Sequence, residues 1–285
     1  MPPGVAGPSL PLVVMLHGCT QDPDDFAVGT GMNALARDQG FYVLYPAQAQ
    51  DANPSRCWNW FKHNHQGRDR GETAGIATMT HAVIQAHGVD PERVYIAGLS
   101  AGGAMAALVA AAYPEIFAAV GVHSGLPPTA ARSRPQRLAA MRTGASATTL
   151  PAGMPVRMRS EASTATAAVL PVPAIVFHGD QDQTVHPRNA EQVIEVMLKS
   201  RARSSASTAN RPVIDQGVST QGRRYARSTH RSGPGQPIAE HWLVHGAGHA
   251  WSGGQAAGSY TDTQGPDASR EMLRFFFEQT TPRKG

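Results

Sequence analysis

The stretch Arg93-Val94-Tyr95-Ile96-Ala97-Gly98-Leu99-Ser100-Ala101-Gly102 decides the fold of this chain. Its first half is β-branched and aromatic, which predicts a strand, and the alanine-rich residues 103–110 after it predict a helix. A G-x-S-x-G pentapeptide between a strand and a helix is typical of a sharp turn that presents a nucleophilic serine, here Ser100. The flanking glycines are expected to provide steric clearance. The plainer alternative is a glycine-rich turn that only packs the helix on the strand.

Apolar segments and helical patterns alternate on both sides of this turn. Strands are expected at 10–16, 41–46, 93–97, 117–122, 172–177 and 239–244, and helices at 32–39, 73–87, 103–110, 189–199 and 268–279. In the last of these helices, Leu273 and the residues from Phe275 to Phe277 are expected to face inward. Residues 22–26 are interpreted as a polar turn. The alternation predicts an α/β protein with a mostly parallel central sheet and helices on both faces.

The length of 285 residues is suited to one domain over residues 1–285. Residues 127–169 are rich in Pro, Ala, Ser, Thr and Arg and are expected to form a lid or a small insertion. The polar stretch 201–237 leaves room for an edge hairpin near 223–229. The first strand begins so early that N-terminal strands are expected to have been trimmed.

Composition excludes several classes of function. The formal net charge is only +4, and no basic stripe with interleaved aromatic residues is present, so nucleic acid is not an expected partner. No apolar run reaches the roughly 18 residues of a membrane span, so no membrane partner is expected either. The start of the chain lacks the pattern of a signal peptide. We expect a monomer or a weak homodimer.

A serine nucleophile needs a base and a carboxylate that orients the base. In the α/β-hydrolase order the acid follows the serine and the histidine comes last. Asp180 and Asp182 both follow a predicted strand, and the spacing from Gly179 to Val185 favours Asp182 as the acid. Asp180 is then expected to bond its own backbone in a turn.

Twelve histidines are present, so position must select among them. His249 follows the last predicted strand in a glycine-rich turn, which is the place of the base. His245 is interpreted as a strand-end residue with a satisfied side chain. His63 and His65 lack the cysteine or carboxylate partners of a metal site, so no metal and no cofactor are expected. The other histidines interpreted as surface or packing residues are His81, His87, His230 and His241.

The oxyanion of a tetrahedral intermediate should meet two backbone N–H groups. One is expected from Ala101, directly after the nucleophile, and the other from the loop after His17-Gly18, where Cys19 or Thr20 is the donor. Cys19 and Cys57 are the two cysteines of the chain, and the sequence leaves open whether they are bonded or free. A disulfide would be typical of an exported protein.

Five blocks carry a family resemblance, and they run from about residue 11 to residue 254: Pro11-Leu-Val-Val-Met-Leu-His-Gly-Cys-Thr-Gln21, Cys57-Trp-Asn-Trp-Phe61, Val94-Tyr-Ile-Ala-Gly-Leu-Ser-Ala-Gly-Gly-Ala-Met105, His178-Gly-Asp-Gln-Asp-Gln-Thr-Val185 and Gly246-Ala-Gly-His-Ala-Trp-Ser-Gly-Gly254. With them the chain resembles the α/β-hydrolases that include polyhydroxybutyrate depolymerases and feruloyl esterases of the carbohydrate esterase 1 type. The first two blocks are specific to the depolymerase-like branch.

The resemblance implies Ser100 as nucleophile, Asp182 as acid and His249 as base. It also implies an oxyanion hole made by the amides of Cys19 and Ala101, and a disulfide between Cys19 and Cys57. The tryptophans would then line a shallow groove for an acyl chain, with core packing as the alternative for at least one of them: Trp58, Trp60 and Trp251.

The expected activity is hydrolysis, through an acyl-enzyme, of poly- or oligo(3-hydroxybutyrate) or of related short-chain hydroxyalkanoate esters, with short oligomers or soluble esters favoured over solid polymer. Feruloyl or acetylxylan ester hydrolysis, peptide hydrolysis on the same fold, and a non-catalytic binding protein are the alternatives. A secreted or periplasmic location is expected if the cysteines are bonded, and a cytoplasmic one stays open.

Overall fold

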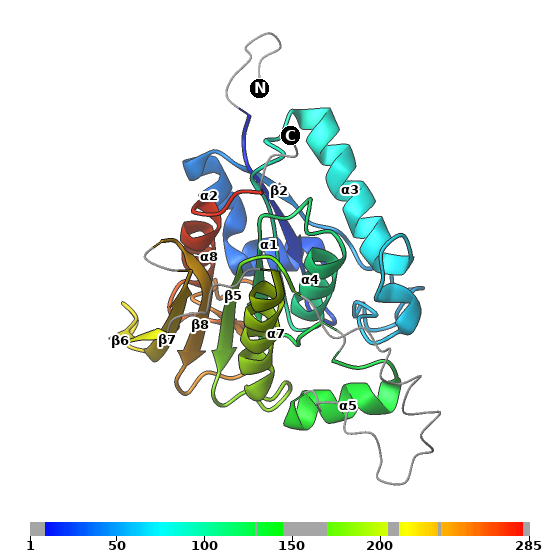
Figure 1. Cartoon of the computed structure of the whole chain (residues 1–285). Helices are drawn as coiled ribbons and strands as arrows, with labels where there is room; N and C mark the ends of the chain where they lie inside the picture. The colour runs from blue at the N-terminus through cyan, green and yellow to red at the C-terminus, as the bar shows by residue number, and fades with distance from the viewer. Residues whose placement is uncertain (1–8, 129, 145–169, 205–210, 233–234, 282–285) are drawn as a thin grey trace.

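The computed structural model of the chain describes residues 9–128, 130–144, 170–204, 211–232 and 235–281 (Figure 1). Of the predicted lid or insertion, residues 129 and 145–169 lie outside the described residues. Its described part contains one helix, α5 (Arg134–Thr143), which begins at the N-cap Ser133. No helix in the described ranges is long and apolar enough to cross a membrane.

The main sheet has eight strands in the order β2-β1-β3-β4-β5-β8-β7-β6. Neighbours from β2 to β8 pair in parallel, whereas β7 is antiparallel to both β8 and β6. The strands are β1 (Leu12–Leu16), β2 (Tyr42–Leu44), β3 (Val94–Leu99), β4 (Ala119–His123), β5 (Ala174–Gly179), β6 (Val213–Val218), β7 (Arg224–Arg231) and β8 (Pro237–Val244). The predicted mostly parallel sheet is thereby confirmed, and so is the edge hairpin.

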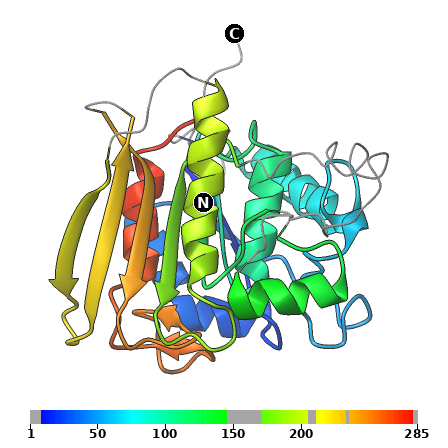
Figure 2. The ribbon, with the colours of Figure 1, turned by 60° about the horizontal axis from the view of Figure 1, so that its bottom comes forward.

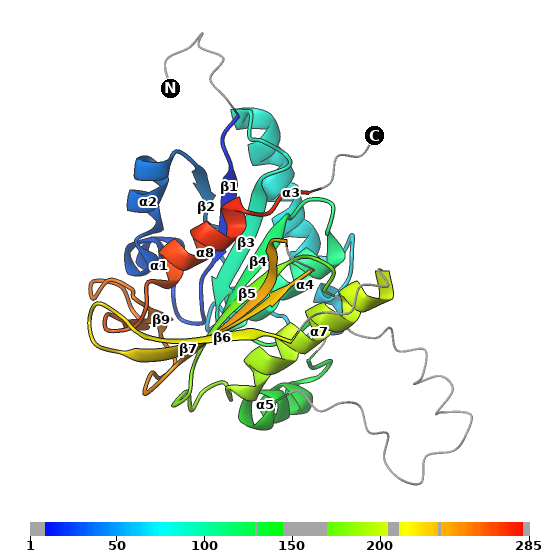
Figure 3. The ribbon, with the colours of Figure 1, turned by 60° about the vertical axis from the view of Figure 1, so that its left-hand side comes forward.

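Helices cover both faces of this sheet, as predicted (Figure 3). Figure 3 shows α1, α2 and α8 on one side and α3, α4 and α7 on the other. Besides α5, the helices are α1 (Pro23–Thr30), α2 (Met32–Gln39), the 3₁₀ helix η1 (His63–His65), α3 (Gly71–His87), α4 (Ala101–Ala112), α7 (Arg188–Ser204) and α8 (Ala268–Phe277).

Strand β1, next to the edge strand β2, is buried on both faces, so its side chains contribute to two separate apolar cores. Leu12, Val14 and Leu16 pack in the cluster that contains α3, α4 and α7. Val13 and Met15 point to the opposite face and pack with α1, α2 and α8. The alternation follows from the two-residue period of a strand, and it fixes the sheet between its two helical layers.

Two local predictions were wrong. The residues interpreted as a polar turn at 22–26 begin helix α1, because the Asp22 side chain caps the amide of Asp25 and Pro23 takes the first helical position. Phe277, expected to face inward, ends α8 with 37 % of its surface exposed. The sequence reading also missed a two-stranded sheet of β9 (Trp251–Ser252) and β10 (Thr261–Asp262).

Strand β6 is an exposed edge strand of the sheet. Its side chains are open on both faces, and Val213, Ile214 and Val218 are 55 %, 63 % and 62 % exposed. The carboxyl ends of the parallel strands lie elsewhere in the molecule, away from β6. There the orange segment containing β9 lies beside blue α1 (Figure 2), and the Gln255 amide donates to the Gly29 carbonyl.

Candidate active site

Ser100 stands in the sharp turn between β3 and α4. Its φ and ψ are 57° and −118°, a conformation that non-glycine residues rarely adopt and that is found mainly at functional sites. The turn is held by a hydrogen bond from the Ser100 amide to the His123 carbonyl at 2.9 Å. Gly102 is needed here, because a Cβ at that position would overlap the carbonyl oxygens of Leu16 and His17. The sequence therefore forms the predicted strand–turn–helix, with the clearance that glycine provides.

Asp182 and His249 are brought together from the loops after β5 and β8. His249 Nδ1 lies 2.7 Å from Asp182 Oδ2, and their side chains are 12 % and 0 % exposed. The other carboxylate oxygen, Oδ1, accepts the amides of Thr184 and Val185 at 2.9 and 2.8 Å. Because an ionised carboxylate only accepts hydrogen bonds, His249 Nδ1 is the donor and its Nε2 is left free to accept a proton.

His178 is a further partner of the carboxylate, which sequence reasoning did not single out. Its Nε2 donates to the Val185 carbonyl at 2.8 Å and lies 3.3 Å from Asp182 Oδ2. Burial alone would raise the pKa of Asp182. Hydrogen bonds from the two histidines outweigh burial and hold this pKa well below its ordinary value. The carboxylate is thus ionised although it is buried.

Asp180 forms a second, more exposed aspartate–histidine pair with His245. The Asp180 Oδ2 and His245 Nδ1 atoms are 2.9 Å apart, with side chains 29 % and 39 % exposed. Asp180 Oδ1 accepts the Gly246 amide at 2.7 Å, so Asp180 caps the turn after β8 rather than its own turn. His245 has a satisfied side chain at a strand end, as predicted.

His123 links the serine turn to the loop of His249, a role that no sequence pattern indicated. Its carbonyl accepts the Ser100 amide, and its ring Nε2 accepts the amide of Ser252, three residues after His249, at 2.9 Å. The ring stacks between Phe177 and Trp251. Within the described residues the Ser100 hydroxyl makes no hydrogen bond; serine–histidine contacts commonly tighten only when substrate binds.

The loop after β1 contains the Cys19 amide, the second candidate donor for an oxyanion. The Gly18 amide donates to Gln21 Oε1 at 2.9 Å, and the Gly18 carbonyl accepts from His17 Nδ1 at 2.8 Å. The Thr20 hydroxyl bonds the Cys19 carbonyl, and the Thr20 amide donates to Ser55. Across the described part of the chain, the Cys19 amide has no acceptor. The Ala101 amide likewise has none there, since it lies at the first position of α4.

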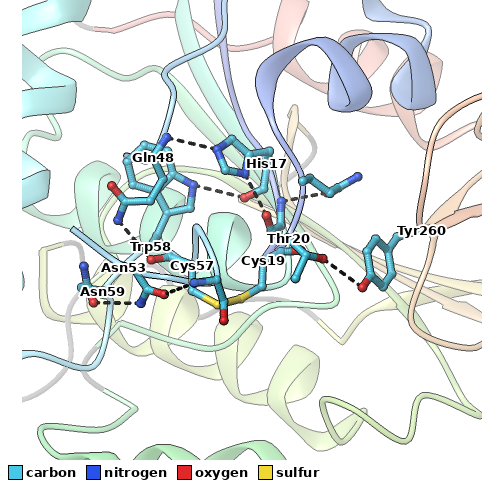
Figure 4. Close-up of a disulfide and its surroundings, with 12 residues drawn as sticks. His17, Cys19, Thr20, Gln48, Asn53, Cys57, Trp58, Asn59 and Tyr260 are labelled. Atoms are coloured by element: carbon cyan, nitrogen blue, oxygen red, sulfur yellow. Dashed lines mark hydrogen bonds between the residues drawn. A yellow bond between two sulfur atoms is a disulfide. The ribbon is translucent and has the colours of Figure 1, made fainter. Parts of the chain in front are cut away.

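The predicted disulfide between Cys19 and Cys57 is confirmed (Figure 4). It joins the loop after β1 to the segment that carries Trp58. The Trp58 indole N–H adds a hydrogen bond to the His17 carbonyl at 3.1 Å. The candidate oxyanion loop is therefore fixed from the side by one covalent bond and one hydrogen bond.

The tryptophans lie in the core. Trp58, Trp60 and Trp251 are 2 %, 4 % and 1 % exposed. The Trp251 indole donates to Ser269 Oγ at 3.1 Å. Packing is what the structure shows for all three, and their contact with substrate stays a prediction. Tyr260, 46 % exposed with its hydroxyl 3.1 Å from that of Thr20, is an accessible aromatic residue beside the loop.

Throughout the described ranges, no group of three or more histidine, cysteine or acidic side chains is arranged to hold a metal ion. His63 and His65 lie in η1, where His65 Nδ1 accepts the amide of Glu72. The chemistry available here is that of a serine, an imidazole, a carboxylate and two open amides.

Burial of neutral histidines predicts loss of stability in acid. Burial lowers the pKa of His17 and His123 from 6.5, and it lowers the pKa of His241 to about 4. The unfolded chain takes up protons below pH 6.5 while the folded chain resists them, so the free energy of unfolding should fall as pH drops from 6.5 toward 4. Each such histidine contributes up to about 1.4 kcal/mol per pH unit.

Urea unfolding at pH 7.5 and pH 5.0 measures this loss. In His241→Gln, the loss between the two pH values should be smaller by about 2 kcal/mol than in the wild type, because one of the histidines no longer titrates. An equal loss in both proteins would contradict the assignment to His241.

Comparisons with known proteins find depolymerases and esterases among the relatives of this chain. Poly(3-hydroxyalkanoate) depolymerase C of Paucimonas lemoignei is 34 % identical over 84 % of this chain and 54 % of its own length. Feruloyl esterase B of Thermothelomyces thermophilus is 33 % identical over 41 % of this chain and 39 % of its own length. The chain therefore spans about half, or less, of the curated relatives that it matches.

The fold is shared with a solved esterase. An acetyl xylan esterase from Aspergillus awamori superimposes with a TM-score of 0.68 over 95 % of this chain and 89 % of that chain, at 20 % identity. At the level of sequence, the profile of a family described as "Esterase PHB depolymerase" matches residues 1–216, which is more than half of the chain. This chain belongs to the Esterase PHB depolymerase family.

Proposed function

We propose that this protein is a serine esterase that hydrolyses carboxylic esters through an acyl-enzyme. The observation that carries the proposal is the buried Asp182–His249 pair, whose Oδ2 and Nδ1 atoms are 2.7 Å apart. The pair lies at the carboxyl ends of the parallel strands, as does the Ser100 turn. The pair leaves His249 Nε2 able to take the serine proton. Its placement after β5 and β8 follows the serine, acid, histidine order of α/β-hydrolases.

In the first half of the reaction, Ser100 Oγ attacks the ester carbonyl carbon while His249 Nε2 takes the hydroxyl proton. Negative charge develops on the carbonyl oxygen, and the open amides of Cys19 and Ala101 are the donors proposed to stabilise it. The C–O bond to the alcohol then breaks, and His249 returns its proton to the leaving oxygen. The products of this half are the free alcohol and an ester on Ser100.

Water completes the cycle by the same route. His249 takes a proton from water, whose oxygen attacks the acyl carbon, and Ser100 leaves with the proton returned from His249. Asp182 stays ionised throughout and stabilises the imidazolium. No step needs a metal or a cofactor.

We infer a short 3-hydroxyalkanoate ester, such as an oligomer of 3-hydroxybutyrate, as the substrate. The relative named a poly(3-hydroxyalkanoate) depolymerase aligns over 84 % of this chain, against 41 % for the feruloyl esterase and for a probable acetylxylan esterase A of Aspergillus fumigatus. Feruloyl or acetylxylan ester hydrolysis is the second candidate, since these names recur among the relatives. The disulfide supports a secreted or periplasmic location.

A substrate panel tests this proposal. p-Nitrophenyl esters of increasing chain length, a 3-hydroxybutyrate oligomer and methyl ferulate are assayed side by side with the wild type. We expect hydrolysis of the short esters and the oligomer, with methyl ferulate cleaved more slowly. Fastest cleavage of methyl ferulate would select the second candidate. No hydrolysis together with no labelling by a fluorophosphonate would contradict an esterase.

A further inference from the structure

Gln21 is a buried amide that none of the catalytic steps uses directly. It is 2 % exposed and lies two residues after Cys19. Its Oε1 accepts the Gly18 amide at 2.9 Å. Its Nε2 donates to Asp25 Oδ2 at 2.9 Å and lies 3.2 Å from both the carbonyl and the hydroxyl of Ser259. One side chain therefore joins the loop after β1 to helix α1 and to the segment between β9 and β10.

Contacts on Gly18 control the direction of the Cys19 amide. The Gly18 carbonyl and the Cys19 N–H belong to one planar trans peptide and point in opposite directions. His17 Nδ1 holds that carbonyl at 2.8 Å, while Gln21 holds the Gly18 amide on the preceding peptide. With both ends of Gly18 held, the open Cys19 N–H has one direction. A Cβ at Gly18 would lie 3.0 Å from Gln21 Oε1, so glycine permits this close approach.

The far end of Gln21 is anchored by an ionised carboxylate. Burial alone would raise the pKa of Asp25, but hydrogen bonds from Ser259 and Gln21 bring this pKa below its ordinary value. Asp25 Oδ1 accepts the Ser259 amide at 2.8 Å. The carbonyl of the next residue, Tyr260, accepts the amide of Trp251 at 2.7 Å. Trp251 lies two residues after His249. The anchor therefore reaches the loop that carries the candidate base.

A second contact at the surface repeats this connection. The hydroxyls of Thr20 and Tyr260 are 3.1 Å apart (Figure 4). Both residues have positive φ, 65° and 51°, although neither is glycine. Such residues persist only where their surroundings hold them, and they cluster at functional sites. Two neighbouring contacts thus join the same two segments.

We propose that Gln21 is a positioning residue that sets the direction of the Cys19 amide toward the oxyanion and couples the oxyanion loop to the loop of His249. This inference rests on the proposed esterase function. Gln21 acts through Gly18 and Ser259 and does not itself meet the substrate. Its loss should therefore weaken transition-state stabilisation more than substrate binding.

Gln21→Met tests the positioning role, since methionine keeps a similar length and removes the amide's hydrogen bonds. With p-nitrophenyl butyrate, we expect kcat to fall about 10- to 100-fold while KM changes less than about threefold. This loss is smaller than the 100- to 1,000-fold caused by deleting an oxyanion donor, because the Cys19 amide is still present.

Gln279→Met is the matched control. Gln279 is also a buried amide, 6 % exposed, and its Nε2 donates to the Pro237 carbonyl at the start of β8, away from the carboxyl ends of the strands. We expect this variant to lose stability in urea but to keep the wild-type kcat. An equal loss of kcat in both variants would show that removing any buried glutamine side-chain amide lowers kcat. That result would overturn the specific role of Gln21.

Gln21→Glu provides a readout that a purely structural role would not move. The new carboxyl lies beside Asp25, with His17, Asp22 and Arg56 as the other charged or titratable groups near this loop. Protonated, it can still donate to Asp25; ionised, it is repelled. The ratio of variant to wild-type kcat should be highest near pH 5.5 and fall by about tenfold or more toward pH 8. A ratio independent of pH would overturn the inference.

The outcomes separate the inference from the function on which it rests. A wild type that hydrolyses no ester overturns both. An active wild type with an unchanged Gln21→Met kcat overturns the positioning role alone. If Gln21→Met does not fold, as judged by near-UV circular dichroism, the pH ratio of Gln21→Glu decides.

Discussion

Ser100→Ala should lower kcat for p-nitrophenyl butyrate by about 10⁵- to 10⁶-fold, because it removes the hydroxyl that we propose forms the acyl-enzyme. The fold should persist, because the Ser100 amide, rather than its hydroxyl, holds the turn through the His123 carbonyl. Alanine must adopt the same positive φ of 57°, so no new backbone strain arises. Thermal unfolding of the variant should therefore stay close to that of the wild type.

Two measurements check this result. Initial rates give the loss of kcat, and the mass of the intact protein after treatment with a fluorophosphonate should increase for the wild type and stay unchanged for Ser100→Ala. Retention of more than about one hundredth of the activity in a folded, unlabelled variant would assign the nucleophile to another residue.

Asp182→Asn should lower kcat about 10⁴-fold, for a reason that lies in its hydrogen bonds. Asp182 Oδ1 accepts two backbone amides, from Thr184 and Val185, so the carbonyl oxygen of asparagine is expected to take this place. The NH₂ group would then face His249 Nδ1 and hold the ring with its proton on Nε2. In that tautomer His249 cannot accept the proton of Ser100.

Asp180→Asn is the matched control for this substitution. It makes the same chemical change two residues away, in the more exposed pair with His245. We expect its kcat to stay within about threefold of the wild-type value, as measured with the same ester. If Asp180→Asn lost more activity than Asp182→Asn, the acid would be Asp180 and the order favoured by the sequence spacing would be reversed.

The elements that the sequence predicts well are those with local causes. The turn at Ser100 depends on adjacent residues, and the strands around it follow from runs of buried apolar side chains. The start of α1 was missed because Asp22 and Pro23 are typical both of turns and of helix N-termini. The packing of Phe26 in the core, which local sequence does not reveal, favours the helix.

Contacts that support the site escaped prediction because they join distant residues. Gln21 and Ser259 are 238 positions apart, and His123 meets Ser252 across 129. No local pattern marks such partners, since a buried glutamine or histidine has the same neighbours in sequence whether or not it holds a loop. The tryptophans show the converse case. Their motif is distinctive, yet their near-complete burial depends on how the segment after β2 folds back on the sheet.

The Cys19–Cys57 bridge has a practical consequence for bioconjugation. It uses both cysteines of the sequence, so the oxidised protein presents no thiol to maleimide reagents. A cysteine introduced by Ile214→Cys would then be the single point of attachment. Ile214 is 63 % exposed on β6, two strands beyond β8 in the sheet. A dye or a bead coupled there would be attached at the outer edge of the sheet. The carboxyl ends of the parallel strands would stay open to solution.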